Sequence, residues 1–96
     1  MIDDAYALEL YMMAVAVVEA KGTIITVGLT TLREYRHGNL IVHYMPSTGH
    51  LDIWYRRKVF TVNRRKGALR VEFYAPGEWE DELEEAAGKL LPAKKR

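Results

Sequence analysis

A histidine and an aspartate, His43 and Asp52, are the side chains of this sequence best placed to transfer a proton. A tight turn at residues 46–49 would set them opposite each other on neighbouring strands, and a histidine–carboxylate pair is a common acid–base unit. No cysteine or serine nucleophile stands beside them, although Ser47 and Thr48 lie in the adjoining turn. A cross-strand polar pair on a solvent-facing sheet is more often structural than catalytic. We therefore expect a protein that is not an enzyme.

Metal and nucleotide chemistry find little support in the sequence. His37, His43 and His50 do not follow a zinc-ligand spacing, and the chain has no cysteine. No glycine-rich loop joins a strand to a helix, so a phosphate-binding loop is not predicted. The acidic run at 78–82 falls in a predicted helix, where helical spacing scatters its carboxylates around the axis. We expect neither a bound metal nor a cofactor.

Aromatic and cationic residues in the middle of the chain form the stronger candidate site. Residues 33–75 carry nine Lys or Arg against three acids, whereas the segments on either side are net acidic. Bases of single-stranded nucleic acid stack on aromatic planes while cations neutralise the phosphates. The predicted contacts are Trp54 and Tyr74 for stacking and Arg56, Arg57, Lys58, Arg64, Arg65, Lys66 and Arg70 for phosphates. The sequence thus favours a small protein that binds single-stranded nucleic acid, DNA or RNA.

A second interpretation of the same residues stays open. The aromatic side chains could be covered by a helix or a partner subunit, and the basic residues could simply solvate the turns that contain them. The protein would then be a homo-oligomeric interaction or regulatory module with no nucleic-acid role.

A helix is predicted from Asp3 or Asp4 to Lys21, because the acids can cap its first turn and Gly22 can end it. Within residues 5–19 the less apolar sector spans only about 80°, so apolar side chains occupy about 220° of the circumference. The less apolar sector consists of Ala5, Glu9, Met12, Ala16 and Glu19. So wide an apolar arc indicates either a helix buried in a deep core or a homo-oligomer formed through this helix, and for so small a chain we favour the homo-oligomer. The apolar run is too short for a membrane span, which needs about 20 residues.

An antiparallel meander of four to five strands is predicted after the helix, because apolar residues alternate and turn residues recur at short spacing. The strands are Thr31–Arg36, Leu40–Met45, His50–Arg56, Val59–Arg64 and Ala68–Tyr74. The segment Thr23–Gly28 could be a further strand or a crossing loop.

Turn geometry then predicts the pairing of the strands. A turn at 46–49 pairs Val42 with Ile53, a turn at Arg57-Lys58 pairs Ile53 with Val62, and a turn at Arg65-Lys66 pairs Val62 with Leu69. One face, the predicted core, holds Leu40, Val42, Tyr44, Leu51, Ile53, Tyr55, Phe60, Val62, Leu69, Val71 and Phe73. The other holds Ile41, His43, Met45, His50, Asp52, Trp54, Arg56, Val59, Thr61, Asn63, Arg70, Glu72 and Tyr74.

A second helix is predicted at Glu78–Leu91, where Trp79, Leu83, Ala86 and Leu90 form one apolar stripe. The fold class is therefore α+β: an N-terminal helix, an antiparallel β-meander and a C-terminal helix. A chain of 96 residues is enough for one hydrophobic core. We expect a single domain at residues 1–92, followed by a short basic tail at 93–96.

Composition indicates the setting. The absence of cysteine and of a basic leader before the apolar helix favours a cytoplasmic protein. Many Arg, Lys and Glu residues, with only two Asn and no Gln, are typical of proteins from hot environments.

The combination of an apolar oligomerising helix with an antiparallel sheet carrying Trp54, Arg70 and Tyr74 resembles the ThermoDBP-type single-stranded DNA-binding proteins of thermophilic archaea. The similarity is one of architecture and involves no family motif. It implies that single strands bind in a cleft of exposed hydrophobic and basic residues, which here would be the aromatic and basic groups named above.

Overall fold

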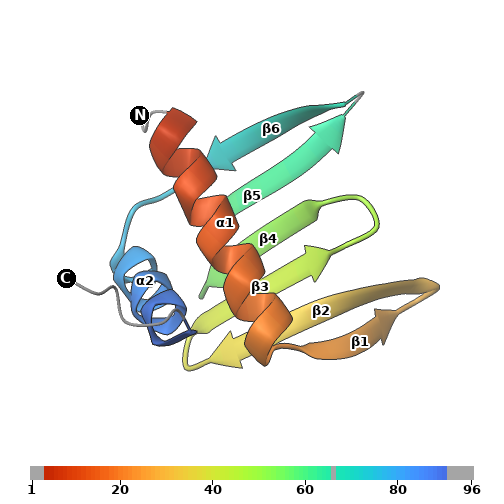
Figure 1. Cartoon of the computed structure of the whole chain (residues 1–96), viewed down its shortest axis with the longest axis horizontal. Coiled ribbons are helices and arrows are strands. Elements are labelled where there is room, and N and C mark those ends of the chain that lie inside the picture. The colour runs from red at the N-terminus through yellow and green to blue at the C-terminus, as the bar shows by residue number, and fades with distance from the viewer. Residues whose placement is uncertain (1–3, 66, 91–96) are drawn as a thin grey trace.

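A computed structural model describes residues 4–65 and 67–90, with only the backbone of Arg65. It contains one antiparallel sheet and two helices (Figure 1). The elements are α1 (Asp4–Lys21), β1 (Thr23–Val27), β2 (Thr30–His37), β3 (Leu40–Met45), β4 (His50–Tyr55), β5 (Lys58–Arg65), β6 (Ala68–Phe73) and α2 (Glu78–Leu90). The sheet has six strands in chain order, one more than the upper predicted number, because residues 23–27 form an edge strand. The predicted α+β class is confirmed.

The pairing of β3 with β4 is the predicted one, with Val42 opposite Ile53. The pairing of β4 with β5 differs by two residues, because Ile53 lies opposite Phe60 rather than Val62. The bend lies one residue earlier than predicted, at Arg56-Arg57, where Arg56 adopts a φ of 72°, and a register shift between Ile53 and Trp54 accompanies it. The tight turn predicted at Arg57-Lys58 is therefore wrong.

The pairing of β5 with β6 is also displaced by two residues from the prediction. Val62 lies opposite Val71 rather than Leu69, and Arg65 lies opposite Ala68. The turn is thus one residue later than predicted, with Gly67 at a φ of 82°, a conformation that glycine adopts without steric cost. A shift of two residues preserves which face each side chain occupies, so the predicted faces largely survive both corrections.

Both helices lie on one face of the sheet, and α1 crosses it diagonally (Figure 1). The core between helices and sheet includes the predicted strand residues Leu40, Val42, Leu51, Ile53, Phe60 and Val62. Two residues that were predicted to lie in the core are exposed instead, because α1 does not cover the β6 edge. Leu69 is 41% exposed and Val71 is 36% exposed. Val59, predicted on the opposite face, is buried in the core next to the irregular β4–β5 connection.

Helix α1 ends where the backbone N–H of Gly22 donates to the carbonyl of Val18 at 2.8 Å. The predicted polar sector of the helix is confirmed, because all five of its members are exposed. The wide apolar arc is buried or half-buried against the sheet and α2 except at Leu8, which is 49% exposed, and Met12 of the opposite sector is 61% exposed. In the described part of the chain, no helix is long and apolar enough to cross a membrane.

Helix α2 begins at a reciprocal cap, because the Gly77 N–H donates to Glu80 Oε1 and the Glu80 N–H donates to the Gly77 carbonyl. Trp79 is buried against Phe60 and Phe73, and its indole N–H donates to the carbonyl of Ala75 at 2.8 Å. Leu91, the predicted last residue of this helix, and the predicted tail at 93–96 lie outside the described residues.

Three tyrosine hydroxyls tie the helices to each other and to the sheet. Tyr6 of α1 donates to Glu80 of α2 at 2.6 Å, and Tyr55 of β4 donates to Glu82 of α2 at 2.6 Å. Tyr11 of α1 donates to the carbonyl of Gly49 in the β3–β4 turn at 2.8 Å. The helices are thereby positioned on one face, and the opposite face remains open.

Candidate functional site

The open face, which faces away from both helices, carries a row of polar residues, one from each strand from β2 to β6. The strand registers align Glu34, His43, Asp52, Thr61 and Glu72 directly across the sheet. Directly opposed side chains in an antiparallel sheet share one face and lie within contact distance. Three carboxylates therefore occupy the middle of a face that the sequence predicted to be cationic.

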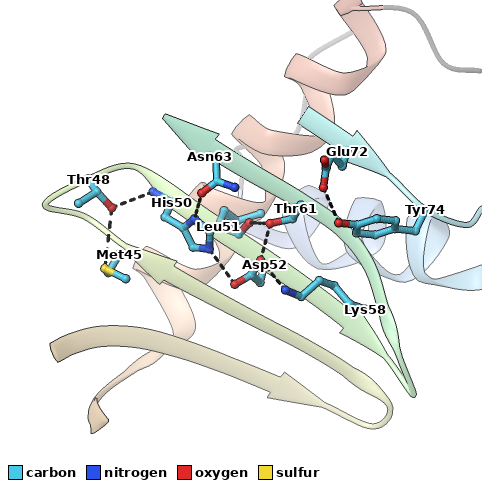
Figure 2. Close-up of polar contacts among 10 residues, drawn as sticks. All are labelled: Met45, Thr48, His50, Leu51, Asp52, Lys58, Thr61, Asn63, Glu72 and Tyr74. Atoms are coloured by element: carbon cyan, nitrogen blue, oxygen red, sulfur yellow. Dashed lines mark hydrogen bonds and ion pairs between the residues drawn. The ribbon is translucent and has the colours of Figure 1, made fainter. Parts of the chain in front are cut away.

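Asp52 lies at the centre of a hydrogen-bond network (Figure 2). Its carboxylate accepts a bond from the Thr61 hydroxyl, and its Oδ2 lies 2.9 Å from His50 Nε2. Lys58 Nζ is 3.5 Å from Oδ1. The other ring nitrogen of His50, Nδ1, lies 2.6 Å from Asn63 Oδ1. The network thus links neighbouring strands β4 and β5 through side chains as well as through the backbone.

The surroundings of Asp52 favour its ionised form. Burial alone would raise the pKa of Asp52, but the hydrogen bonds from Thr61 and His50 and the charges of His50 and Lys58 lower it further than burial raises it. Its pKa therefore lies below the ordinary value of 3.8. The group is a charged structural acceptor at neutral pH and is not suited to act as a general acid there.

A second carboxylate, Glu34, also lies between a histidine and a cationic side chain. His43 Nε2 lies 2.8 Å from its Oε2, and Arg36 Nε lies 3.3 Å from its Oε1. The hydrogen bond from His43, with a smaller contribution from Arg36, lowers the pKa of Glu34 despite its partial burial. The predicted His43–Asp52 neighbours are confirmed as a cross-strand pair, but each hydrogen bonds elsewhere.

The side chains of the proton-transfer alternative are held by these contacts, and so is Thr48. Thr48 accepts a bond from the His50 backbone N–H and donates toward the sulfur of Met45. It is therefore engaged in its own turn. Within residues 4–65 and 67–90, no three His, Asp or Glu side chains are grouped in a way that could hold a metal ion.

The predicted stacking residues lie near one another at the end of the sheet formed by the β4–β5 connection. Trp54 pairs with Lys58 across this connection, and the Lys58 ammonium lies 5.4 Å from the centre of the indole ring. The edge of His43 contacts the same ring, with centroids 4.8 Å apart. Tyr74 follows β6 at this same end, because its N–H donates to the Val59 carbonyl. Two strand spacings, about 10 Å, separate the aromatic positions on β4 and β6.

Tyr74 is exposed, and its hydroxyl donates to Glu72 (Figure 2). This hydrogen bond, more than the partial desolvation and the charge of Glu72, raises the pKa of Tyr74. The ring stays neutral at neutral pH and remains a stacking surface.

The predicted cations divide into two groups at opposite ends of β5. Arg56 and Arg57 lie in the bend before this strand, whereas Arg64 and Arg65 lie at its far end. The strand has eight residues, so the two groups are about 23 Å apart along the chain direction. Arg70 lies opposite Asn63 on the open face, toward the far end. Lys66 lies outside the described residues.

Arg56, Arg57, Arg64 and Arg70 make no ion pair with any described residue. Lys58 differs, because it contacts both Asp52 and the Trp54 ring. The free guanidinium groups therefore lie at the two ends, and in the middle of the open face Glu34 and Asp52 have cationic partners while Glu72 accepts the Tyr74 hydroxyl.

Functional prediction from the sequence overlooked Glu34, His50 and Asn63. Glu34 could have been found from the turn at 38–39, because the β2–β3 register that it sets places Glu34 opposite His43. His50 and Asn63 were placed on the correct face, but their hydrogen bond depends on the corrected β4–β5 register.

Comparison of this chain with protein-family models, with curated protein sequences and with solved structures finds no significant match. The geometry of the chain's own residues therefore carries the functional argument.

Proposed function

We propose that this protein binds single-stranded nucleic acid without enzymatic activity and without a cofactor, using the β4–β5 end of its open sheet face. Trp54 and Tyr74 stack bases, and Arg56, Arg57 and Lys58 contact phosphates there. Arg64 and Arg70, toward the other end of β5, are further candidates for phosphate contact, from opposite faces of the sheet, since Arg64 lies opposite Leu69 and Arg70 opposite Asn63. The sequence adds Arg65 and Lys66 to this set. The similarity to ThermoDBP-type proteins agrees with this proposal and rests on architecture alone.

The grouping of Trp54 on β4, Lys58 on β5 and Tyr74 just after β6, at one end of the sheet, carries the proposal. Stacking of a base on an aromatic ring contributes about 1–3 kcal/mol and tolerates any base. Arg56 and Arg57 project from the adjoining bend, and neither has a carboxylate partner among the described residues. A single strand lying here meets aromatic rings and unpaired cations together.

The carboxylates of the open face restrict the route of the strand. Glu34 and Asp52 are paired with cations, and Glu72 accepts a hydrogen bond from Tyr74. A phosphate backbone placed over this row would displace these partners and face three negative groups. The bound strand is therefore expected to run across the β4–β5 end and to avoid the middle of the face.

The test is a titration of a fluorescently labelled single-stranded oligonucleotide, followed by anisotropy at two salt concentrations. Wild-type protein should bind at low salt and weaken at higher salt. Trp54→Ala should weaken binding by about 1–3 kcal/mol, and Lys89→Ala on the outer surface of α2 should leave it unchanged. Absence of binding at low salt would exclude the proposal.

A protein-interaction module is the second candidate, favoured by exposed apolar residues beside α1. A hollow of about 560 Å³ lies between α1 and β6, and its lining includes Ala7, Val71, Phe73 and Pro76. Leu8 and Met12 of the predicted oligomerising segment, residues 5–19, are the exposed large apolar side chains of α1. A Trp54 fluorescence shift on dilution of a Trp79→Phe variant, with no response to oligonucleotide, would favour this candidate.

A further inference from the structure

The outer edge of β6 is an unpaired strand edge with apolar side chains on its helix-facing side. β6 is the last strand of the sheet and pairs only with β5. Leu69 and Val71 are partly exposed on this side, and Leu8 of α1 lies across the adjoining hollow. An edge strand of this kind is a template for pairing with another strand.

The hydrogen-bonding direction along β6 follows from its last bond to β5. The Tyr74 N–H donates to the Val59 carbonyl, and inward and outward groups alternate along an antiparallel strand. The backbone groups of residues 70 and 72 therefore point toward β5. Those of Leu69, Val71 and Phe73 point away from the sheet, where no strand of the described chain receives them.

The charges of β6 are complementary to those of a second β6. If two copies pair antiparallel about Val71, the outward backbone groups of residues 69, 71 and 73 bond to one another. Arg70 then lies opposite Glu72 of the partner subunit, and the same pair forms a second time by symmetry. These are non-hydrogen-bonded positions, where opposed side chains come closest. Both residues are exposed, and Arg70 has no ion-pair partner among the described residues.

We propose that this protein forms a two-fold symmetric dimer by antiparallel pairing of β6 with β6 of a second copy, centred on Val71. The pairing joins two six-stranded sheets into one and sets Val71 against Val71 of the partner subunit. Leu69 lies opposite Phe73 of the partner subunit, so the apolar hollow beside α1 is filled from the other copy. The interface is isologous and closes after two subunits.

The neighbouring registers are less favourable for a simple reason. A shift of the axis by one residue keeps the outward groups paired but sets Arg70 against Arg70 of the partner subunit, or Glu72 against Glu72 of the partner subunit. Like charges directly opposed in a sheet destabilise the pair. The opposite edge strand, β1, has the sequence Thr-Ile-Ile-Thr-Val and offers no charge that would select a partner or a register.

Charge exchange at Arg70 and Glu72 provides the decisive test, with sedimentation velocity as the measurement and no nucleic acid present. Wild-type protein should sediment as a dimer. Arg70→Glu alone opposes two acids at both positions and should sediment as a monomer, as should Glu72→Arg alone. An equimolar mixture of the two variants should form a heterodimer, because each copy then presents the charge that the other lacks.

Two edge substitutions separate β6 from other contacts. Val71→Lys places like charges on the two-fold axis and should yield a monomer. The matched control is Ile24→Lys on β1, since Ile24 is also an edge residue and is 65% exposed. This control should remain a dimer, and circular dichroism should show all variants folded.

A monomeric wild-type protein at the highest soluble concentration would overturn the proposal. So would dimers that persist in both charge variants, or variants that fail to associate when mixed. Dissociation by Ile24→Lys but not by Val71→Lys would assign the contact to β1 instead. None of these outcomes depends on nucleic-acid binding, so the two proposals can fail separately.

Discussion

Asp52 is the residue on which the polar contacts of the open face converge. Its carboxylate receives the Thr61 hydroxyl, one nitrogen of His50 and the Lys58 ammonium. Hydrogen bonds to a charged group contribute more to stability than neutral ones, and removal of the charge leaves its partners without a counterion. Asp52 thus stabilises the sheet, and it also orients Lys58 beside the Trp54 ring.

Asp52→Asn should destabilise the protein by about 1.5–3 kcal/mol at neutral pH, because it removes a charge-assisted acceptor. The pKa of Asp52 is lower in the folded protein than its ordinary value of 3.8. Its contribution is therefore present above that pH and is lost as the pH falls through the folded pKa. Urea unfolding at about pH 7 and about pH 3 should show the wild-type advantage shrinking in acid.

The control for this measurement is Glu84→Gln on the exposed side of α2, which should change stability little at either pH. A difference between wild type and Asp52→Asn that stays constant with pH would contradict the assigned role of the charge.

The junctions between elements are positioned by close backbone contacts and by the tyrosine hydroxyls. Gly22 joins α1 to β1 where the chain turns back against β2. A Cβ at Gly22 would lie 2.4 Å from the Val18 carbonyl oxygen and 2.9 Å from that of Glu34. The direction in which β1 leaves the helix therefore depends on the absence of a side chain.

Gly22→Ala should destabilise the fold by about 2–3 kcal/mol, because rigid backbone atoms would have to move. Gly28→Ala in the β1–β2 turn is the matched comparison, with a φ of +63° and open space around its Cβ. An alanine at residue 28 would cost only the strain of the left-handed backbone conformation, about 1 kcal/mol of stability. Thermal unfolding followed by circular dichroism measures both, and equal losses would contradict the crowding argument.

Tyr6 links α1 to α2, and this contact has its own titration signature. The hydrogen bond to Glu80, assisted by burial and by nearby acids, raises the pKa of Tyr6 to about 12. A raised folded-state pKa means that the contact stabilises the protein below pH 10 and is lost as the pH rises toward 12.

Tyr6→Phe should therefore lower the free energy of unfolding by about 1 kcal/mol at neutral pH. It should also remove the ultraviolet absorbance change that accompanies ionisation of one tyrosine near pH 12. Glu80→Gln should move that change to lower pH, because the negative acceptor is gone. An absorbance titration that is the same in all three proteins would show that Tyr6 does not hold this contact.

The whole molecule has two layers, with both helices on one face of the sheet and the other face open (Figure 1). The proposed nucleic-acid surface lies on the open face, and the proposed dimer contact lies along the β6 edge. Edge pairing would extend the open face from one copy into the next. The two proposals share Arg70, which faces Glu72 of the partner subunit in the dimer, whereas Trp54 and Lys58 lie on strands away from the β6 edge.

Arg56→Ala/Arg57→Ala should reduce the slope of log affinity against log salt by about 1.4, since each phosphate contact on a single strand contributes about 0.7. Trp54→Ala should lower affinity without changing that slope, because stacking releases no counterions. Oligonucleotide titrations at four salt concentrations measure both. A double variant with an unchanged slope would show that these arginines do not contact phosphates.

The sequence by itself determined the order of all elements except β1, the β3–β4 register and most of the face assignments. These features depend on local signals: Gly22 at a helix end, a turn at 46–49, and apolar residues at every second position. Even the two wrong registers kept most side chains, though not Val59, on their predicted faces, because the errors were of two residues. Trp54 and Tyr74 were accordingly placed on the open face from the sequence.

Only the tertiary structure decided which residues of each face are covered and which charges are neutralised. The diagonal course of α1 leaves Leu69 and Val71 exposed, although their periodicity equals that of the buried strand residues. The bulge after Ile53 brings Lys58 beside Trp54, and the registers gather Glu34, Asp52 and Glu72 into one row. These outcomes depend on contacts between segments far apart in the chain, for which alternation along a single strand contains no signal.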